Sequence, residues 1–243
     1  MYRISEGGEL MNELVRRSSW MMLSCLLQYP DDEWHEAADE IYVSWCELLQ
    51  QDSTEMNERL IHLAGECIAG FAGMDAEAVT EQYVKTFDFG KKTNLYLTYG
   101  QLGEDRERGP ALLKLKQIYE QENMILATEE LPDYLPLMLE YAAVAEGDTG
   151  AGLLFSFKEA LKGIREALIA AGSPYQHVLH AIMLMLEQSG VTEGSVRFEP
   201  PAGCTSAGGM AAGCGPMWAA AGYGGAPVYR KDDAEAAGRG ATQ

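Results

Sequence analysis

Helical spacing of apolar residues runs through the first 189 residues of this 243-residue chain and most constrains its fold. Between about Glu9 and Gln28, for example, Leu10, Leu14, Met21 and Cys25 recur on one helical face. Such spacing is typical of an amphipathic α-helix. Similar patterns follow one another, separated by Pro, Gly or acidic capping residues. We therefore expect an all-α fold, with a single helical domain over residues 1–189.

Capping and breaking residues predict where the helices begin and end. Pro30 ends the first, because the residue before a proline avoids helical backbone angles. In the sequence DSTE, Asp52 and Glu55 have the spacing of a capping box, although Asp replaces the usual Ser or Thr. Other helices are expected after Asp31 or Asp32, from Asp75 to near Gly90, from Pro110 to about Asn123, from about Ala151 to Ala171, and from Ser173–Pro174 onward.

The stretch KKTNLYLTYGQLG, residues 91–103, fits two structures. Leu95, Leu97 and Tyr99 alternate as in a β-strand. A lone strand among helices would have no partner to pair with. We therefore expect a short helix here.

Two prolines lie four residues apart in ELPDYLP, residues 130–136. A proline inside a helix removes a backbone donor and clashes with the preceding turn. The conflict disappears if Asp133 is the N-cap of a helix and its carboxylate accepts the N–H of Leu135. Pro136 then lies among the first helical positions, where no intrahelical bond is lost. Pro132 lies outside the helix and stiffens the approach to it.

The charge balance excludes some classes of partner. The formal net charge is −19 and the isoelectric point is near 4.5. Nucleic acid and anionic membrane surfaces are poor partners for such a chain, because binding them needs a basic face. A basic peptide is favoured, because an acidic field steers cationic ligands. The start of the chain has no secretory pattern, and we expect a cytoplasmic protein.

No motif predicts an enzyme, a metal centre or a cofactor site. His177 and His180 share a helix face, but Glu187 is the only acid close by on that helix, so two partly exposed histidines are expected. Cys204 and Cys214, separated by nine residues, lack the spacing of a zinc pair. The segment that contains them, residues 190–243, is rich in Gly, Ala and Pro and is expected to be a flexible tail.

Two features leave alternatives open. Tyr83 and Phe87 begin an aromatic stripe that continues through Phe89, Tyr96 and Tyr99 and fits either a core or the wall of a peptide groove. In GEDRERGP, residues 103–110, the two arginines fit either a solvated corner or the edge of a groove.

Three blocks in order carry a family resemblance: YVKTFDFGKKTNLYLTY at 83–99, GEDRERGPALLKL at 103–115 and ELPDYLPLMLEYAA at 130–143. Together they resemble the NarJ-type assembly chaperones, the delta-subunit family of respiratory nitrate reductase, within the wider TorD/DmsD group. The resemblance extends from about Leu26 to Leu186. One departure is Tyr134, where the wider group often has a titratable His.

The resemblance implies a TorD-like helical bundle without catalysis. It implies a cytoplasmic chaperone, a monomer or weak dimer, that binds the N-terminal, twin-arginine-like segment of the apo catalytic subunit. Such a chaperone permits molybdenum-cofactor insertion and times membrane assembly. An alternative is an assembly factor that binds molybdopterin or a nucleotide through Arg106 and Arg108. The expected partner-binding residues are Tyr83, Phe87, Leu95, Tyr96, Tyr99, Arg106, Arg108, Leu131, Pro132, Asp133, Tyr134, Leu135, Leu139 and Glu140.

Overall fold

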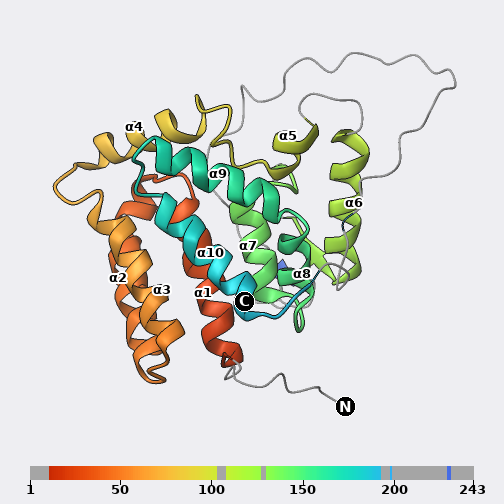
Figure 1. Ribbon diagram of the computed structural model, residues 1–243, viewed down its shortest axis with the longest axis horizontal. Helices are drawn as coiled ribbons and strands as arrows, with labels where there is room; N and C mark the ends of the chain where they lie inside the picture. Colours follow the sequence, from red (N-terminus) through yellow and green to blue (C-terminus); the bar gives the residue numbers. More distant parts are fainter. Residues whose placement is uncertain (1–10, 103–107, 127–129, 193–197, 199–228, 231–243) are drawn as a thin grey trace, which may run out of the picture.

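The computed structural model describes residues 11–102, 108–126, 130–192, 198 and 229–230 (Figure 1). Within these ranges the chain is helical, which confirms the predicted all-α class. The helices are α1 (Glu13–Leu27), α2 (Asp32–Gln50), α3 (Glu55–Ala69), α4 (Ala76–Phe87), α5 (Leu97–Leu102), α6 (Arg108–Gln121), α7 (Leu135–Val144), α8 (Thr149–Phe155), α9 (Lys158–Ala170) and α10 (Gln176–Gln188). Two short strands, β1 (Met124–Ile125) and β2 (Tyr229–Arg230), pair antiparallel.

Side-chain caps fix most of the early helix starts. Asp31 caps α2 and Asp75 caps α4, as the sequence predicts. The prediction of a capping box that begins at Asp52 is wrong. Thr54 is the N-cap of α3, and its hydroxyl accepts the N–H of Asn57 at 3.1 Å.

Helix α7 is the centre of the bundle. Every residue from Leu135 to Ala143 is buried, and α7 packs chiefly against α1 and α8. Figure 1 shows it in the middle of the molecule. A helix that is apolar on all sides is stable only in such a position. Its last carbonyls point at α1, where the Nε of Arg17 donates to Ala143 O at 2.9 Å and Nη1 of Arg16 to Ala142 O at 3.2 Å.

The single helix expected over residues 151–171 is divided into α8 and α9. The chain turns at Ser156 and Phe157, and the Phe157 side chain is fully buried. Its ring centroid lies 5.1 Å from that of Phe198. Burying this large ring outweighs the helical propensity of the segment, which sequence spacing alone does not reveal.

The start of α10 also differs from the prediction. The helix begins at Gln176, after a turn in which the carbonyl of Ser173 accepts the N–H of Gln176 at 3.1 Å. The Ser173 hydroxyl is buried without a hydrogen-bond partner, so it is not a cap.

Part of the segment after residue 190 packs on the bundle. Val191 and Phe198 are buried, and the backbone N–H of Phe198 donates to the Ser156 hydroxyl at 3.2 Å. Tyr229–Arg230 pairs with β1. Cys204 and Cys214 lie outside the described residues, and the flexibility of the tail stays a prediction.

Candidate functional site

The two most distinctive sequence blocks meet at one corner of the bundle. The N–H of Leu97 donates to Asp133 O at 3.0 Å, and the N–H of Leu135 donates to Leu95 O at 2.9 Å. Between these bonds, Tyr96 and Tyr134 form an isolated antiparallel bridge. The short helix predicted in residues 91–103 is confirmed as α5. Two of the three alternating residues, Leu97 and Tyr99, belong to α5 itself, and the segment before α5 pairs with the segment that leads into α7 at a single bridge.

Asp133 caps a different helix from the one predicted. Its Oδ2 accepts the backbone N–H of Thr98 at 3.2 Å and the Thr98 hydroxyl at 2.5 Å, so the carboxylate caps α5. The N–H of Leu135, the predicted donor, is already bound to a carbonyl. Tyr134 is the N-cap of α7 and has no side-chain cap bond. Pro136 lies in the first turn of α7, as predicted.

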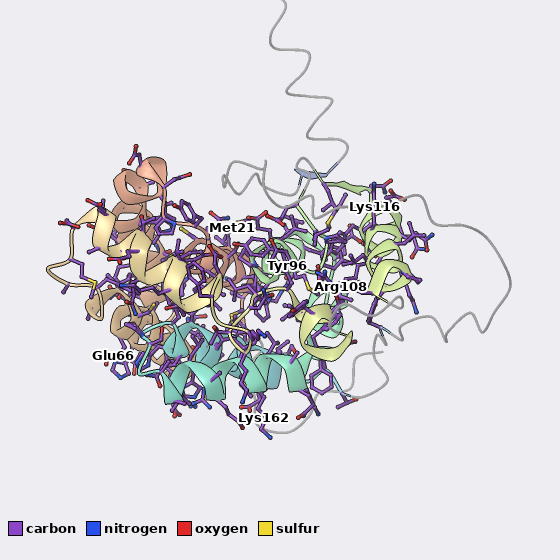
Figure 2. All side chains as sticks on the ribbon, turned by 90° about the horizontal axis from the view of Figure 1, so that it is seen from above. Met21, Glu66, Tyr96, Arg108, Lys116 and Lys162 are labelled. Carbon is purple, nitrogen blue, oxygen red and sulfur yellow. The ribbon has the colours of Figure 1, made fainter. Side chains whose placement is uncertain are left out.

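Arg108, at the start of α6, joins this buried carboxylate to the surface. Its Nη2 lies 3.4 Å from Asp133 Oδ2, and its Nε donates to the Thr98 hydroxyl at 3.2 Å. The guanidinium carbon lies 5.7 Å from the ring centre of Tyr99 and 6.0 Å from that of Tyr96. Figure 2 shows Tyr96 beside Arg108. Charge-assisted bonds and cation–π contacts therefore hold both rings in place.

A chain of tyrosines runs inward from this surface. The rings of Tyr96 and Tyr134 are 5.3 Å apart, and the Tyr96 hydroxyl donates to Glu130 Oε1 at 2.9 Å. The hydroxyls of Tyr134 and Tyr83 are 3.0 Å apart, and Tyr83 in turn donates to Leu27 O. Burial raises the pKa of Tyr134 and of Tyr83 well above the ordinary value. The Tyr134 side chain is therefore a neutral phenol at physiological pH, and its hydroxyl can donate a hydrogen bond.

Several of the predicted binding residues belong to the core. Glu140 is 3% exposed, and its Oε1 accepts Gln28 Nε2 at 2.7 Å and the Ser24 hydroxyl at 3.3 Å. The carbonyl of Pro132 accepts the Tyr119 hydroxyl. Leu131 is partly exposed, and Arg106 lies outside the described residues. The other buried members of the predicted set are Tyr83, Phe87, Leu95, Asp133, Leu135 and Leu139.

A groove of about 810 Å³ lies between the segment before α5 and helix α9. One wall includes Tyr96 and Tyr99 from the predicted set, so the structure brings these two residues to a surface together. The whole wall is Lys91, Lys92, Asn94, Tyr96, Leu97 and Tyr99. We call this cavity the α9 groove.

The opposite wall of the α9 groove was not predicted. It carries Glu159 and Glu166 on one edge and otherwise small side chains, with Ile164 as the exception: Ala160, Gly163, Ala167, Ala170 and Ala171. A Cβ atom placed at Gly163 would meet no atom within 4 Å, so this wall is open. The recurrence of Gly and Ala at helical spacing in KGIREALIAAG was the available sequence signal.

The two histidines considered as metal ligands, His177 and His180, do not line the α9 groove. His177 and His180 are partly exposed on α10. Burial and the nearby Arg165 and Arg59 lower the pKa of His180. In the part of the chain that the structure describes, no three His, Cys, Asp or Glu side chains are arranged to hold a metal ion. Nor does any described helix combine the length and apolar character needed to cross a bilayer.

The comparisons with known proteins agree with the resemblance of the three blocks. The nitrate reductase delta subunit family matches residues 31–175. The chain is 41% identical over 184 residues to a probable nitrate reductase molybdenum cofactor assembly chaperone, NarJ, of Bacillus subtilis, covering 75% of this chain and 96% of that one. It is 34% identical over 123 residues to the Escherichia coli K12 chaperone NarJ, covering 51% and 50% of the two chains.

A third relative is larger. Nitrate reductase-like protein NarX of Mycobacterium tuberculosis is 29% identical over 163 residues, which is 67% of this chain and 23% of that protein. The two relatives named NarJ are assembly chaperones, which confirms the prediction that the present chain is not an enzyme. By the family match and by its identity to the Bacillus protein over nearly the whole of that chain, this protein belongs to the nitrate reductase delta subunit family.

Proposed function

We propose that this protein is a cytoplasmic chaperone that binds the N-terminal segment of the apo catalytic subunit of nitrate reductase. Binding keeps that subunit competent for molybdenum-cofactor insertion and delays its membrane assembly until insertion is complete. The names of the NarJ relatives support a role in assembly of this enzyme. The α9 groove, with aromatic side chains on one wall and small side chains on the other, is the observation that supports segment binding.

The dimensions of the groove suit a short helix. Its α9 wall extends from Glu159 to Ala171. At 1.5 Å per residue this is about 18 Å, the length of an occupant helix of about three turns. The small residues allow the backbone of the occupant to approach α9 closely, and Tyr96 and Tyr99 offer flat apolar surfaces.

The charges of the groove favour a basic segment on one side. Glu159 and Glu166 are exposed and lie seven residues apart, two turns along the same edge of α9. In the proposed complex, arginines of a twin-arginine-like segment pair with these two carboxylates. Lys91 and Lys92 line the other wall and disfavour basic side chains there. The net charge of −19 adds a steering field that salt weakens.

The test is calorimetric titration with a synthetic peptide from the N-terminus of the nitrate reductase catalytic subunit of the same organism. The full chain is expected to bind it with an affinity that falls as salt is raised. Gly163→Trp fills the α9 groove and is expected to weaken binding by about tenfold or more, about 1.4 kcal/mol. Ile169→Trp is the matched control, because Ile169 is exposed on α9 and does not line the groove.

Two outcomes would contradict this proposal. Absence of binding at low salt would remove the segment as a ligand. Equal affinities of the Gly163→Trp and Ile169→Trp variants would place the segment elsewhere on the surface.

Direct binding of molybdopterin or a nucleotide has weaker support. The Arg108 guanidinium already contacts Asp133, Thr98 and two tyrosine rings. Recruiting it to an anion would require breaking these contacts. Titration with molybdopterin or GTP distinguishes this alternative, since tight binding abolished by Arg106→Ala would favour it.

A further inference from the structure

Two adjacent lysines stand on the aromatic wall of the α9 groove. Lys91 and Lys92 both line the groove, and both residues are exposed. They belong to YVKTFDFGKKTNLYLTY, the first of the three blocks that carry the family resemblance. The formal net charge of the chain is −19, so two neighbouring cations at a binding surface are a local reversal of sign.

A tight turn holds the backbone of the two lysines in place. The N–H of Thr93 donates to the Gly90 carbonyl at 3.1 Å, and the Thr93 hydroxyl donates to the carbonyls of Thr86 and Gly90. The Thr93 side chain is buried. A Cβ atom at Gly90 would overlap the Thr93 hydroxyl and the Thr86 carbonyl, so the turn closes only with glycine there. Lys91 and Lys92 therefore extend from a rigid base.

The two ammonium groups have no carboxylate partner in the part of the chain that the structure describes. By contrast Lys85, on α4, is paired with Glu81 at 2.8 Å. Asp88 is the carboxylate nearest to the two lysines in the sequence, and burial raises its pKa. A neighbouring cation would have the opposite effect. Both ammonium groups are therefore available to a ligand.

The two walls of the α9 groove carry opposite charges that do not meet. Glu159 and Glu166 line the α9 wall, and neither carboxylate is in an ion pair with the lysines across the groove. These two acids and the two lysines are the only charged residues among those described as lining it. A site with one cationic and one anionic wall selects a ligand whose own charges are separated in the same way.

We propose that Lys91 and Lys92 form an anion-recognition element, which binds the carboxylates of acidic side chains on the segment held in the α9 groove. That segment directs its basic residues to Glu159 and Glu166, its acidic residues to the lysines, and its apolar residues into the groove between them. Binding depends on this pattern as well as on positive charge. The assignment rests on the function proposed above, because it concerns an occupant of the same groove.

Three peptides with defined charge patterns test this recognition. Each residue of a helix is turned by about 100° from the one before. Acetyl-RLEAALARLEAA-amide, the patterned peptide, therefore has its arginines on one side, its glutamates on the opposite side and its leucines between them. Glutamine replaces both glutamates in acetyl-RLQAALARLQAA-amide, the acid-free peptide. Glutamine replaces both arginines in acetyl-QLEAALAQLEAA-amide, the arginine-free peptide.

Each peptide is titrated into the full chain by calorimetry at low salt. The patterned peptide is expected to bind most tightly, and the acid-free and arginine-free peptides are each expected to have a Kd about threefold higher or more, as for the loss of exposed charge pairs. The acid-free peptide is the most basic of the three. A chain of net charge −19 that responded only to positive charge would prefer it, so recognition by the lysines requires the opposite order.

Variants of the protein assign the effect to the two lysines. The double variant Lys91→Gln/Lys92→Gln is expected to bind the acid-free peptide at least as tightly as the patterned peptide. Lys162→Gln is the matched control, because Lys162 is exposed on α9 and does not line the groove, and it is expected to keep the order of the parent chain. Gly163→Trp is expected to weaken binding of the patterned peptide about tenfold or more, because it fills the groove.

Several results would overturn this assignment. They are no binding of the patterned peptide, equal or tighter binding of the acid-free peptide to the parent chain, and an unchanged order in Lys91→Gln/Lys92→Gln. The titration with the native segment decides the proposed function separately. If the native segment binds in the groove and the glutamates of the patterned peptide have no effect, only the role of the lysines fails. If the native segment does not bind but the three peptides follow the expected order, only the proposed function fails.

Discussion

The buried carboxylate of Asp133 accepts hydrogen bonds from both the backbone N–H and the hydroxyl of Thr98, 35 residues earlier in the chain. This pair fixes the start of α5 against the segment that leads into α7. Because Tyr96 and Tyr99 flank Thr98, the pair also fixes the aromatic wall of the α9 groove. The most specific motif of the sequence therefore acts mainly as the support of a candidate binding surface.

Replacement of Asp133 tests this supporting role. Asp133→Ala removes the cap of α5 and leaves the Arg108 guanidinium without its carboxylate. We expect the free energy of unfolding to fall by about 2–3 kcal/mol, less than for a fully buried pair because Arg108 is partly exposed. Equilibrium urea denaturation measures the change. Glu120→Ala, at an exposed position of α6, is the control and should differ little from the parent protein. Unchanged unfolding of Asp133→Ala would show that the cap contributes no stability.

The sequence predicted this corner only in part. Proline chemistry located the start of α7 to within one residue, since the backbone rules at Pro132 and Pro136 are local. The role of Asp133 was missed because its partner Thr98 is distant in sequence, and a local N-cap was the only partner that spacing could suggest. The same limit explains the missed pairing of Leu95 with Leu135, because a single bridge leaves no periodic pattern.

Of the two walls of the α9 groove, the sequence predicted residues of the aromatic wall but not the wall on α9, again because the outcome depends on packing between distant segments. An aromatic stripe looks alike in a core and in a groove, and only packing separates buried Tyr83 and Phe87 from partly exposed Tyr96 and Tyr99. The opposite wall on α9 was missed because small residues such as Gly163 leave no hydrophobic signature. Their function is to leave space, which becomes visible only when neighbouring elements are in place.

The hydrogen bond between Tyr134 and Tyr83 leads to a second prediction. Tyr83 donates to Leu27 O, so Tyr134 is the donor to Tyr83. Tyr134→Phe removes one neutral bond and should cost about 1 kcal/mol. Tyr83→Phe leaves both the Leu27 carbonyl and the Tyr134 hydroxyl unsatisfied and should cost about 2 kcal/mol or more.

A double-mutant cycle on urea denaturation separates these contributions. The combined variant is expected to cost less than the sum of the two single changes, because the bond between them is removed only once. Strict additivity would show that the two hydroxyls do not interact.

The pH dependence of stability should contain a contribution from His180. Burial, Arg165 and Arg59 lower the pKa of this side chain below its ordinary value of 6.5. The unfolded chain therefore takes up the proton at a higher pH than the folded chain does. The resulting stability is fully present above about pH 6.5 and is lost as the pH falls through the folded pKa.

We therefore expect the parent protein to lose more stability than His180→Asn when the pH falls below 6.5. Urea denaturation at a series of pH values measures the difference, and an NMR titration of the His180 ring proton reports the folded pKa directly. A folded pKa above 6.5 would contradict the prediction and reverse its sign.

Two helical glycines should respond in opposite directions to the same substitution. Gly150 in α8 lies against α7, and a Cβ atom there would overlap the backbone of Ala142, whereas a Cβ at Gly163 meets nothing. Gly150→Ala must push two packed helices apart and should destabilise the fold by about 1–3 kcal/mol. Gly163→Ala gains helical propensity and should stabilise it by up to about 1 kcal/mol. Thermal and urea denaturation of the two variants, compared with the parent chain, check both signs. Destabilisation by Gly163→Ala would mean that the α9 wall is closed, and would remove the open groove on which the proposed peptide binding depends.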